Sequence, residues 1–139
     1  MKLLKLLFLF LWQLPQNIVG AFCIFKYNNY DIKFSSKGEP IEIYYKKWFG
    51  SGVSLGDIVI LDNKYYKPDR YSKIVMDTIR HEHGHQIQSR ILGPLYLPII
   101  GLLSLLGNIV FRIFKIKSKY YYKLPWEWWA DKLGGVKRE

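Results

Sequence analysis

The chain has 139 residues, of which half are hydrophobic and 17% aromatic, and its formal net charge is +10. This length suits a single domain over residues 1–139, and the apolar content excludes an intrinsically disordered chain. A basic excess beside long apolar runs favours an anionic membrane surface as partner. The basic residues are scattered and form no zinc-finger, RNP or helix-turn-helix signature, so nucleic acid is not expected as a partner.

The first apolar run, residues 6–25, carries no charge and follows Lys2 and Lys5. A basic start before an apolar run resembles a secretory signal peptide, but the bulky Phe22 spoils the small-residue cleavage pattern. Pro15 interrupts the run in its middle. We therefore expect an uncleaved membrane-contacting helix or helical hairpin, with a cleaved signal peptide as the alternative.

Residues 41–48 and 53–61 are rich in β-branched and aromatic side chains, which predicts two strands. Residues 50–52, Gly-Ser-Gly, are the expected turn between them, with Gly56 as a bulge or bend. An amphipathic helix is expected next, from about residue 71 to 90, opened by Pro68-Asp69 and stopped by Gly93-Pro94. The predicted fold class is α+β, with a small antiparallel β unit packed on this helix.

The second apolar run, residues 91–111, is 21 residues without a charge. A straight helix of this length would be about 30 Å long, enough to cross a bilayer. Glycines and prolines punctuate the run, which favours a re-entrant or interfacial hairpin whose halves of about ten residues are too short to span. A buried core hairpin of a soluble protein is the alternative.

Residues 81–85 read His-Glu-His-Gly-His and satisfy the pattern H-E-x-x-H. His81 and His85 lie one helical turn apart on one face, so both imidazoles can reach one tetrahedral zinc ion. Glu82 is rotated by about 100°, where it can act on a metal-activated water as the catalytic carboxylate. Gly84 would admit a neighbouring strand or a substrate close to the helix. The alternative is a polar helix face with solvated histidines.

A catalytic zinc normally has three protein ligands, and the remaining histidine, His83, faces away from His81. A carboxylate is therefore needed, and Glu127 is the candidate because it lies on a short predicted helix, residues 126–133, between Pro125 and Gly134-Gly135. Asp131 follows one turn later and is expected to accept the free N–H of a ligating histidine. The alternative for Glu127 and Asp131 is a surface acidic pair.

Together, the two motifs resemble the gluzincin branch of the zincin metallopeptidases, which carries H-E-x-x-H on one helix and E-x-x-x-D on a later one. The resemblance implies zinc ligation by His81, His85 and Glu127, with Glu82 as general base and acid and Asp131 behind the ligands. It also implies that a strand within residues 53–61 lines the cleft and pairs with extended peptide. The block from residue 81 onward is also similar to small uncharacterised bacterial membrane-associated proteins.

This chain is much shorter than most gluzincins, and no histidine follows Glu127. The group that stabilises the oxyanion must then be an arginine or one of three consecutive tyrosines, Tyr120, Tyr121 and Tyr122.

Zinc ligation also constrains topology. If residues 91–111 crossed the bilayer once, His85 and Glu127 would emerge on opposite faces and could not share a metal. Basic residues flank this run on both sides, which favours placing both ends in the cytoplasm. The sequence thus predicts a zinc metallopeptidase at the cytoplasmic membrane surface that acts on peptide or protein substrates. Two alternatives are a noncatalytic membrane protein with a structural or vestigial zinc site, and a membrane-active or scaffolding protein with a chance motif.

Overall fold

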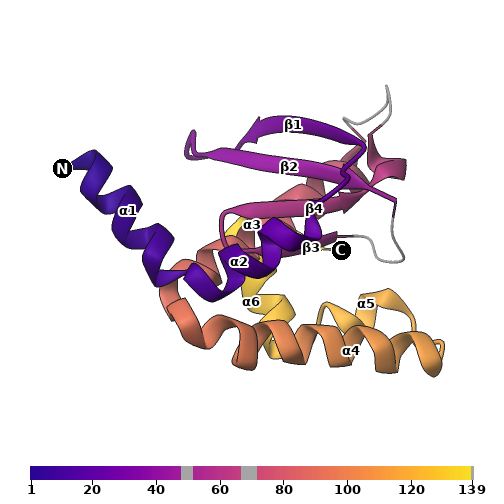
Figure 1. The fold of residues 1–139 in the computed structure, drawn as a ribbon. Coiled ribbons are helices and arrows are strands. Elements are labelled where there is room, and N and C mark those ends of the chain that lie inside the picture. The colour runs from indigo at the N-terminus through magenta and orange to yellow at the C-terminus, as the bar shows by residue number, and fades with distance from the viewer. Residues whose placement is uncertain (48–51, 67–71, 139) are drawn as a thin grey trace.

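The computed structural model describes residues 1–47, 52–66 and 72–138, and it has the expected α+β architecture (Figure 1). The helices described are α1 (Lys2–Trp12), α2 (Leu14–Cys23), α3 (Lys73–Leu92), α4 (Leu102–Ile113), α5 (Ser118–Tyr121) and α6 (Pro125–Gly134). The strands described are β1 (Asn29–Phe34), β2 (Pro40–Lys46), β3 (Gly52–Leu55) and β4 (Ile58–Asp62). Short 3-10 turns lie at Asn63–Tyr65 and Gly93–Leu95, and a π turn lies at Leu97–Gly101.

The sheet is mixed, with strand order β1-β2-β4-β3. β1 and β2 are antiparallel, β2 and β4 are parallel, and β3 and β4 are antiparallel. The prediction of an antiparallel pair from residues 41–48 and 53–61 is therefore wrong. The second segment holds two strands, because Gly56, expected as a bulge or bend, has a φ of 65° and lies in the turn between them. The expected turn at residues 50–52 falls largely outside the described residues.

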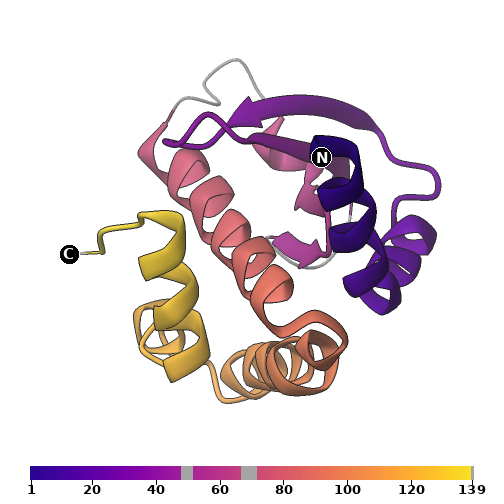
Figure 2. The same cartoon turned by 90° about the vertical axis from the view of Figure 1, so that its left-hand side faces the viewer.

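One face of the sheet packs on α3 and forms the core. Alternation along β2 buries Ile41, Ile43 and Tyr45 on this face, and β4 adds Val59 and Leu61. Val75 and Ile79 of α3 complete the cluster. Figure 2 shows α3 lying between the sheet and α6.

The helix predicted from about residue 71 to 90 is confirmed as α3. Ser72 caps its first turn by accepting a hydrogen bond from the Val75 backbone N–H. The expected opening at Pro68-Asp69 lies outside the described residues. Gly93, with a φ of 55°, ends the helix.

Close packing of α3 on α6 depends on two glycines. A Cβ on Gly84 would lie 1.9 Å from the Ala130 carbonyl oxygen, and one on Gly134 would lie 1.9 Å from the Arg80 carbonyl oxygen. Gly84 was expected to admit a strand or a substrate, but the element it admits is α6. The two helices that carry the motifs, α3 and α6, are therefore in direct backbone contact at these glycines.

The N-terminal helices are tied to the end of α3 by buried polar groups. Ser89 Oγ donates a hydrogen bond to Gln13 Oε1, and Gln16 Nε2 donates to Ser89 Oγ and to the Gly93 backbone carbonyl oxygen. Both glutamines are fully buried. These contacts join α2 to the fold, whereas α1 buries no residue and extends outward (Figure 1).

Neither apolar run forms one long helix. α1 and α2 meet at a bend of 78°, and α4 turns back from the end of α3 at a bend of 116°. Across the ranges described above, no single helix is long and apolar enough to cross a membrane, and only these two bent pairs satisfy that criterion jointly. The hairpin expected inside residues 91–111 is instead made by α3 and α4, with the turn at Gly93–Gly101.

Candidate metal centre

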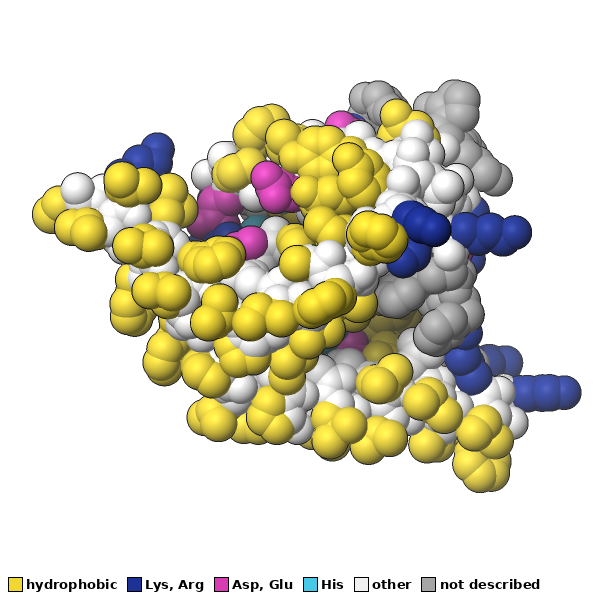
Figure 3. Space-filling model, in the orientation of Figure 1, with side chains coloured by type: hydrophobic (Ala, Val, Ile, Leu, Met, Phe, Trp, Pro, Cys, Tyr) yellow, Lys and Arg dark blue, Asp and Glu magenta, His cyan; other side chains and the backbone are white. Residues whose placement is uncertain are grey.

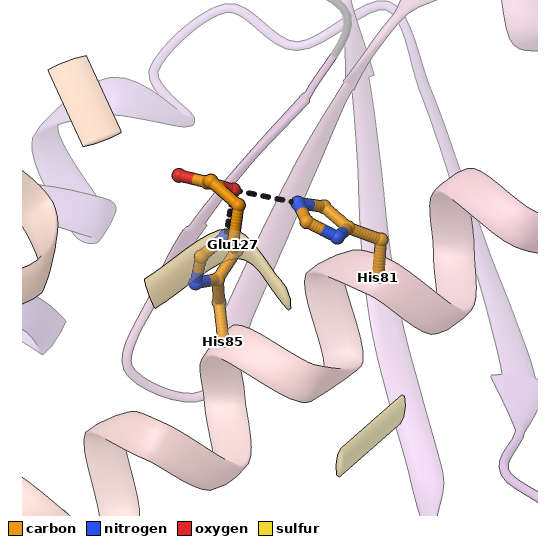
Figure 4. A group of neighbouring side chains, drawn as sticks. All are labelled: His81, His85 and Glu127. Atoms are coloured by element: carbon orange, nitrogen blue, oxygen red, sulfur yellow. Dashed lines mark hydrogen bonds and ion pairs between the residues drawn. The ribbon is translucent and has the colours of Figure 1, made fainter. Parts of the chain in front are cut away.

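His81, His85 and Glu127 come together in one buried cluster, as the two motifs predict (Figure 4). Glu127 Oε2 lies 3.1 Å from His81 Nε2 and 3.2 Å from His85 Nε2. In a tetrahedral zinc site with bonds of about 2.0–2.1 Å, neighbouring ligand atoms are about 3.3 Å apart. The cluster therefore has the spacing and chemistry of a three-ligand site that could hold a metal ion.

Hydrogen bonds behind the histidines orient both rings. His81 Nδ1 donates to Asp131 Oδ1 at 2.7 Å, and His85 Nδ1 donates to Gln88 Oε1 at 2.7 Å. Gln88 Nε2 in turn donates to the Trp126 carbonyl oxygen at 2.8 Å. These contacts leave both Nε2 atoms free to ligate. The contact of Asp131 with the His81 ring is the one expected from the sequence, whereas Gln88 was missed, although it lies three residues after His85 on the same helix.

The two oxygens of Glu127 have different surroundings. Oε2 faces the histidines, while Oε1 accepts hydrogen bonds from Ser104 Oγ and, at 2.8 Å, from the Tyr121 hydroxyl. Ser104 lies on α4, so the returning apolar helix contributes directly to the site. The sequence did not single out Ser104, because nothing local marks a serine inside an apolar run as a partner of Glu127.

Electrostatics hold the cluster in a partly charged state before any metal binds. Burial raises the pKa of Glu127, but hydrogen bonds from His81 and His85 outweigh it and hold that pKa far below its ordinary value. Burial lowers the pKa of His81, but its bonds to Asp131 and Glu127 raise it to about 9. The metal-free site thus resembles an ion pair in which a proton occupies the place of a cation.

Glu82 lies next to the cluster of His81, His85 and Glu127 but is not one of its members. Its side chain is 5% exposed and sits against β3, where a Cβ on Gly52 would lie 3.0 Å from Glu82 Oε1. Burial raises the pKa of Glu82, although the nearby His81 and His85 oppose the shift. A carboxylate of raised basicity next to a metal site is suited to accept a proton from water.

Glu82 and the three residues of the cluster line a cavity of about 890 Å³ between β3 and α4. Of the three tyrosines considered for the oxyanion, Tyr121 and Tyr122 line it, while Tyr120 is exposed to solvent. The Tyr121 hydroxyl donates to Glu127, whereas Tyr122 lies beside His81. Its ring lies edge-on to His81 at 5.1 Å between centroids. Burial raises the pKa of Tyr122 to about 12, so its hydroxyl remains a donor at neutral pH.

Arg138 holds Asp131 and Tyr122 in place. Its Nη2 donates to Asp131 Oδ1 at 2.9 Å, its Nε donates to Oδ2, and its guanidinium lies 3.4 Å from the Tyr122 ring centroid. This clamp was not predicted, because the residue follows the helix-ending glycines in a short basic tail. His83, by contrast, points away as expected, with its Nδ1 donating to Gln86 Oε1 at 2.9 Å.

No protein-family model matches this chain, and no curated protein or solved structure matches it either. The geometry and chemistry of the site are therefore the basis for a proposal about function.

Proposed function

We propose that this chain is a membrane-associated zinc metallopeptidase whose ion is held by His81, His85 and Glu127. The observation that supports this proposal is the buried three-ligand cluster opening on a cavity with Glu82 beside it. Two imidazoles and one carboxylate form a ligand set typical of catalytic zinc. A structural zinc site normally has four protein ligands. Here three protein ligands come together, and the fourth coordination position would face the cavity.

The proposed chemistry is hydrolysis of a peptide bond by water. Zinc, when bound, supplies acidification of a water molecule and polarisation of the substrate carbonyl. Glu82 accepts the proton of the attacking water and delivers it to the departing amine. Tyr122 donates a hydrogen bond to the oxygen that becomes negatively charged. Asp131 and Gln88 keep the two imidazoles in orientation.

A location at the cytoplasmic membrane surface belongs to the same proposal. It is supported by the exposed apolar side chains of α1, α2 and α4 together with the basic charge of the chain. The bent helix pairs suit a protein that enters one leaflet and returns.

The test replaces Glu82 with glutamine, which keeps the size of the side chain and removes its basicity. Glu82→Gln should retain zinc and lower peptide hydrolysis by at least about 100-fold, since a general base contributes that much or more. Glu42→Gln, an exposed carboxylate on β2, is the matched control and should hydrolyse normally. Full activity in Glu82→Gln would refute the proposed mechanism, and zinc binding without hydrolysis in the wild type would favour a structural or vestigial site.

A further inference from the structure

The mouth of the site cavity is lined by apolar side chains that are also exposed to the outside. Val19 of α2 is 40% exposed, Leu102 and Leu105 of α4 are 50% and 51% exposed, and Ile116 is 40% exposed. All four also line the cavity that contains Glu82 and the metal ligands. Two apolar rims thus border the cavity, one on α2 and one on α4 and the segment after it.

These rims continue into a larger apolar surface. Figure 3 shows hydrophobic side chains gathered over α1, α2 and α4, with a hollow between α2 and α4. The exposed apolar residues of α4 and the segment after it are Leu102, Leu103, Leu105, Leu106, Ile109, Val110, Ile113, Phe114 and Ile116. Contiguous apolar surface of this extent marks an interaction site and is not typical of a monomer in water.

The charges beside this surface favour an anionic lipid bilayer as its partner. Arg112 and Lys115 line the cavity, and Lys117, Lys119 and Lys123 follow them closely. Figure 3 shows Lys and Arg side chains at the end of the apolar surface that α4 and α5 form. Apolar side chains bordered by lysines suit insertion among acyl chains with contact to anionic headgroups.

The cavity also offers a polar group to a bound chain. Ser54 on β3 is 2% exposed and lines the cavity, and within the described parts of the chain its Oγ has no hydrogen-bond partner. In the described residues β3 pairs only with β4, so it forms an edge of the sheet. An extended peptide that leaves the bilayer needs such hydrogen-bonding groups for its own backbone.

On the basis of the function proposed above, we infer that the substrate is an apolar peptide segment that passes from the lipid bilayer into the cleft between α2 and α4. Apolar side chains stay in an apolar environment along this route. A polar peptide arriving from water would lose the hydration of its side chains at the rims without compensating hydrogen bonds.

The test measures binding rather than turnover, so its result is independent of catalysis. The full chain with Glu82→Gln is mixed with vesicles of phosphatidylcholine and phosphatidylglycerol that contain a leucine-rich peptide bearing a photoreactive group. A serine-glycine peptide of equal length with the same group is added from water in a parallel sample. We expect cross-linking of the apolar peptide to residues of the cavity and at least about tenfold less with the polar peptide.

Two variants on α4 separate the route into the cleft from simple lipid contact. Leu105 and Leu106 are 51% and 48% exposed, but Leu105 lines the cavity and Leu106 does not. Leu105→Gln and Leu106→Gln should reduce vesicle binding to the same extent. Only Leu105→Gln should also reduce peptide cross-linking per bound protein, by about tenfold.

Four outcomes would overturn the inference. They are failure of the protein to bind the vesicles, equal cross-linking of the polar peptide, equal effects of the two leucine variants on cross-linking, and labelling of the cavity by a photoreactive acyl chain in place of the peptide. Loss of the proposed function would instead appear as an absence of hydrolysis in the wild type, with peptide cross-linking unchanged.

Discussion

At the scale of single residues, the candidate site depends on how each ligand atom is held. Glu127 gives one oxygen to Ser104 and Tyr121 and presents the other to the histidines. Asp131 and Gln88 hold the imidazoles from behind. Each ligand is thus oriented by a hydrogen bond from an element other than its own or from the next turn of its own helix.

The partners of Glu127 should therefore tune metal affinity without changing the fold. We predict that Ser104→Ala and Tyr121→Phe each weaken zinc binding by about tenfold or more, because loss of such supporting bonds commonly costs 10–100-fold in affinity. Competition with a chelator measures the dissociation constant. Tyr120→Phe is the control, since Tyr120 is exposed and outside the cavity. An equal loss in Tyr120→Phe would contradict a specific role for Tyr121.

Protonation of His81 gives a second prediction at this scale. Its pKa in the metal-free fold is raised from 6.5 to about 9, so its bonds stabilise that fold fully below pH of about 6.5 and cease to do so as the pH rises through 9. A metal must displace this proton. At pH 7.5 zinc binding should release a proton from His81, and affinity should rise with pH until about 9.

Calorimetry in buffers of different ionisation enthalpy measures the released protons. Asp131→Asn should reduce that number, because the carboxylate is the hydrogen-bond partner that does most to raise the pKa of His81. A binding enthalpy that is independent of the buffer would contradict the raised pKa.

At the scale of elements, the pairing of α3 with α6 builds the site. The two helices carry the two motifs and approach so closely that Gly84 and Gly134 have no room for a side chain. Capping residues and motif spacing were enough to predict both helices.

The sheet could not be predicted in the same way, because strand pairing depends on packing against α3 and on a turn at Gly56 that split one apolar run into two strands. β1 was missed because its charged residues, Asp31 and Lys33, lie on the partly buried side while its apolar residues are exposed, which reverses the usual strand pattern.

Gly84→Ala should separate the two motif helices. Its new methyl group would lie 1.9 Å from the Ala130 carbonyl oxygen, so α6 must shift and carry Glu127 away from the histidines. We expect a loss of at least about 2 kcal/mol in the free energy of unfolding together with weaker zinc binding. Gly101→Ala is the control, because the nearest atom would lie at an ordinary 3.4 Å. Denaturant unfolding of both variants, with and without zinc, makes the comparison, and wild-type behaviour of Gly84→Ala would argue against the close approach.

At the scale of the whole molecule, the site exists only because the chain turns back between its two motifs. The sequence required both ends of residues 91–111 to reach the same side, and the 116° bend between α3 and α4 provides that return. The sequence could not indicate that Ser104 of α4 contacts Glu127, because the bend brings these two residues together. The same bend places α4 opposite α2 across the cavity, which connects the arrangement of the site to the proposed membrane surface.

Glu127 tests this account most directly, because its place in the site requires both the motif and the return of the chain. Zinc content of purified protein should be about one ion per chain in the wild type and in the control Glu42→Gln. Glu127→Gln preserves the size of the side chain but removes the anionic ligand, and it should lose the zinc while thermal unfolding shows that the metal-free protein remains folded. Retention of one tightly bound zinc in folded Glu127→Gln would contradict the three-ligand site.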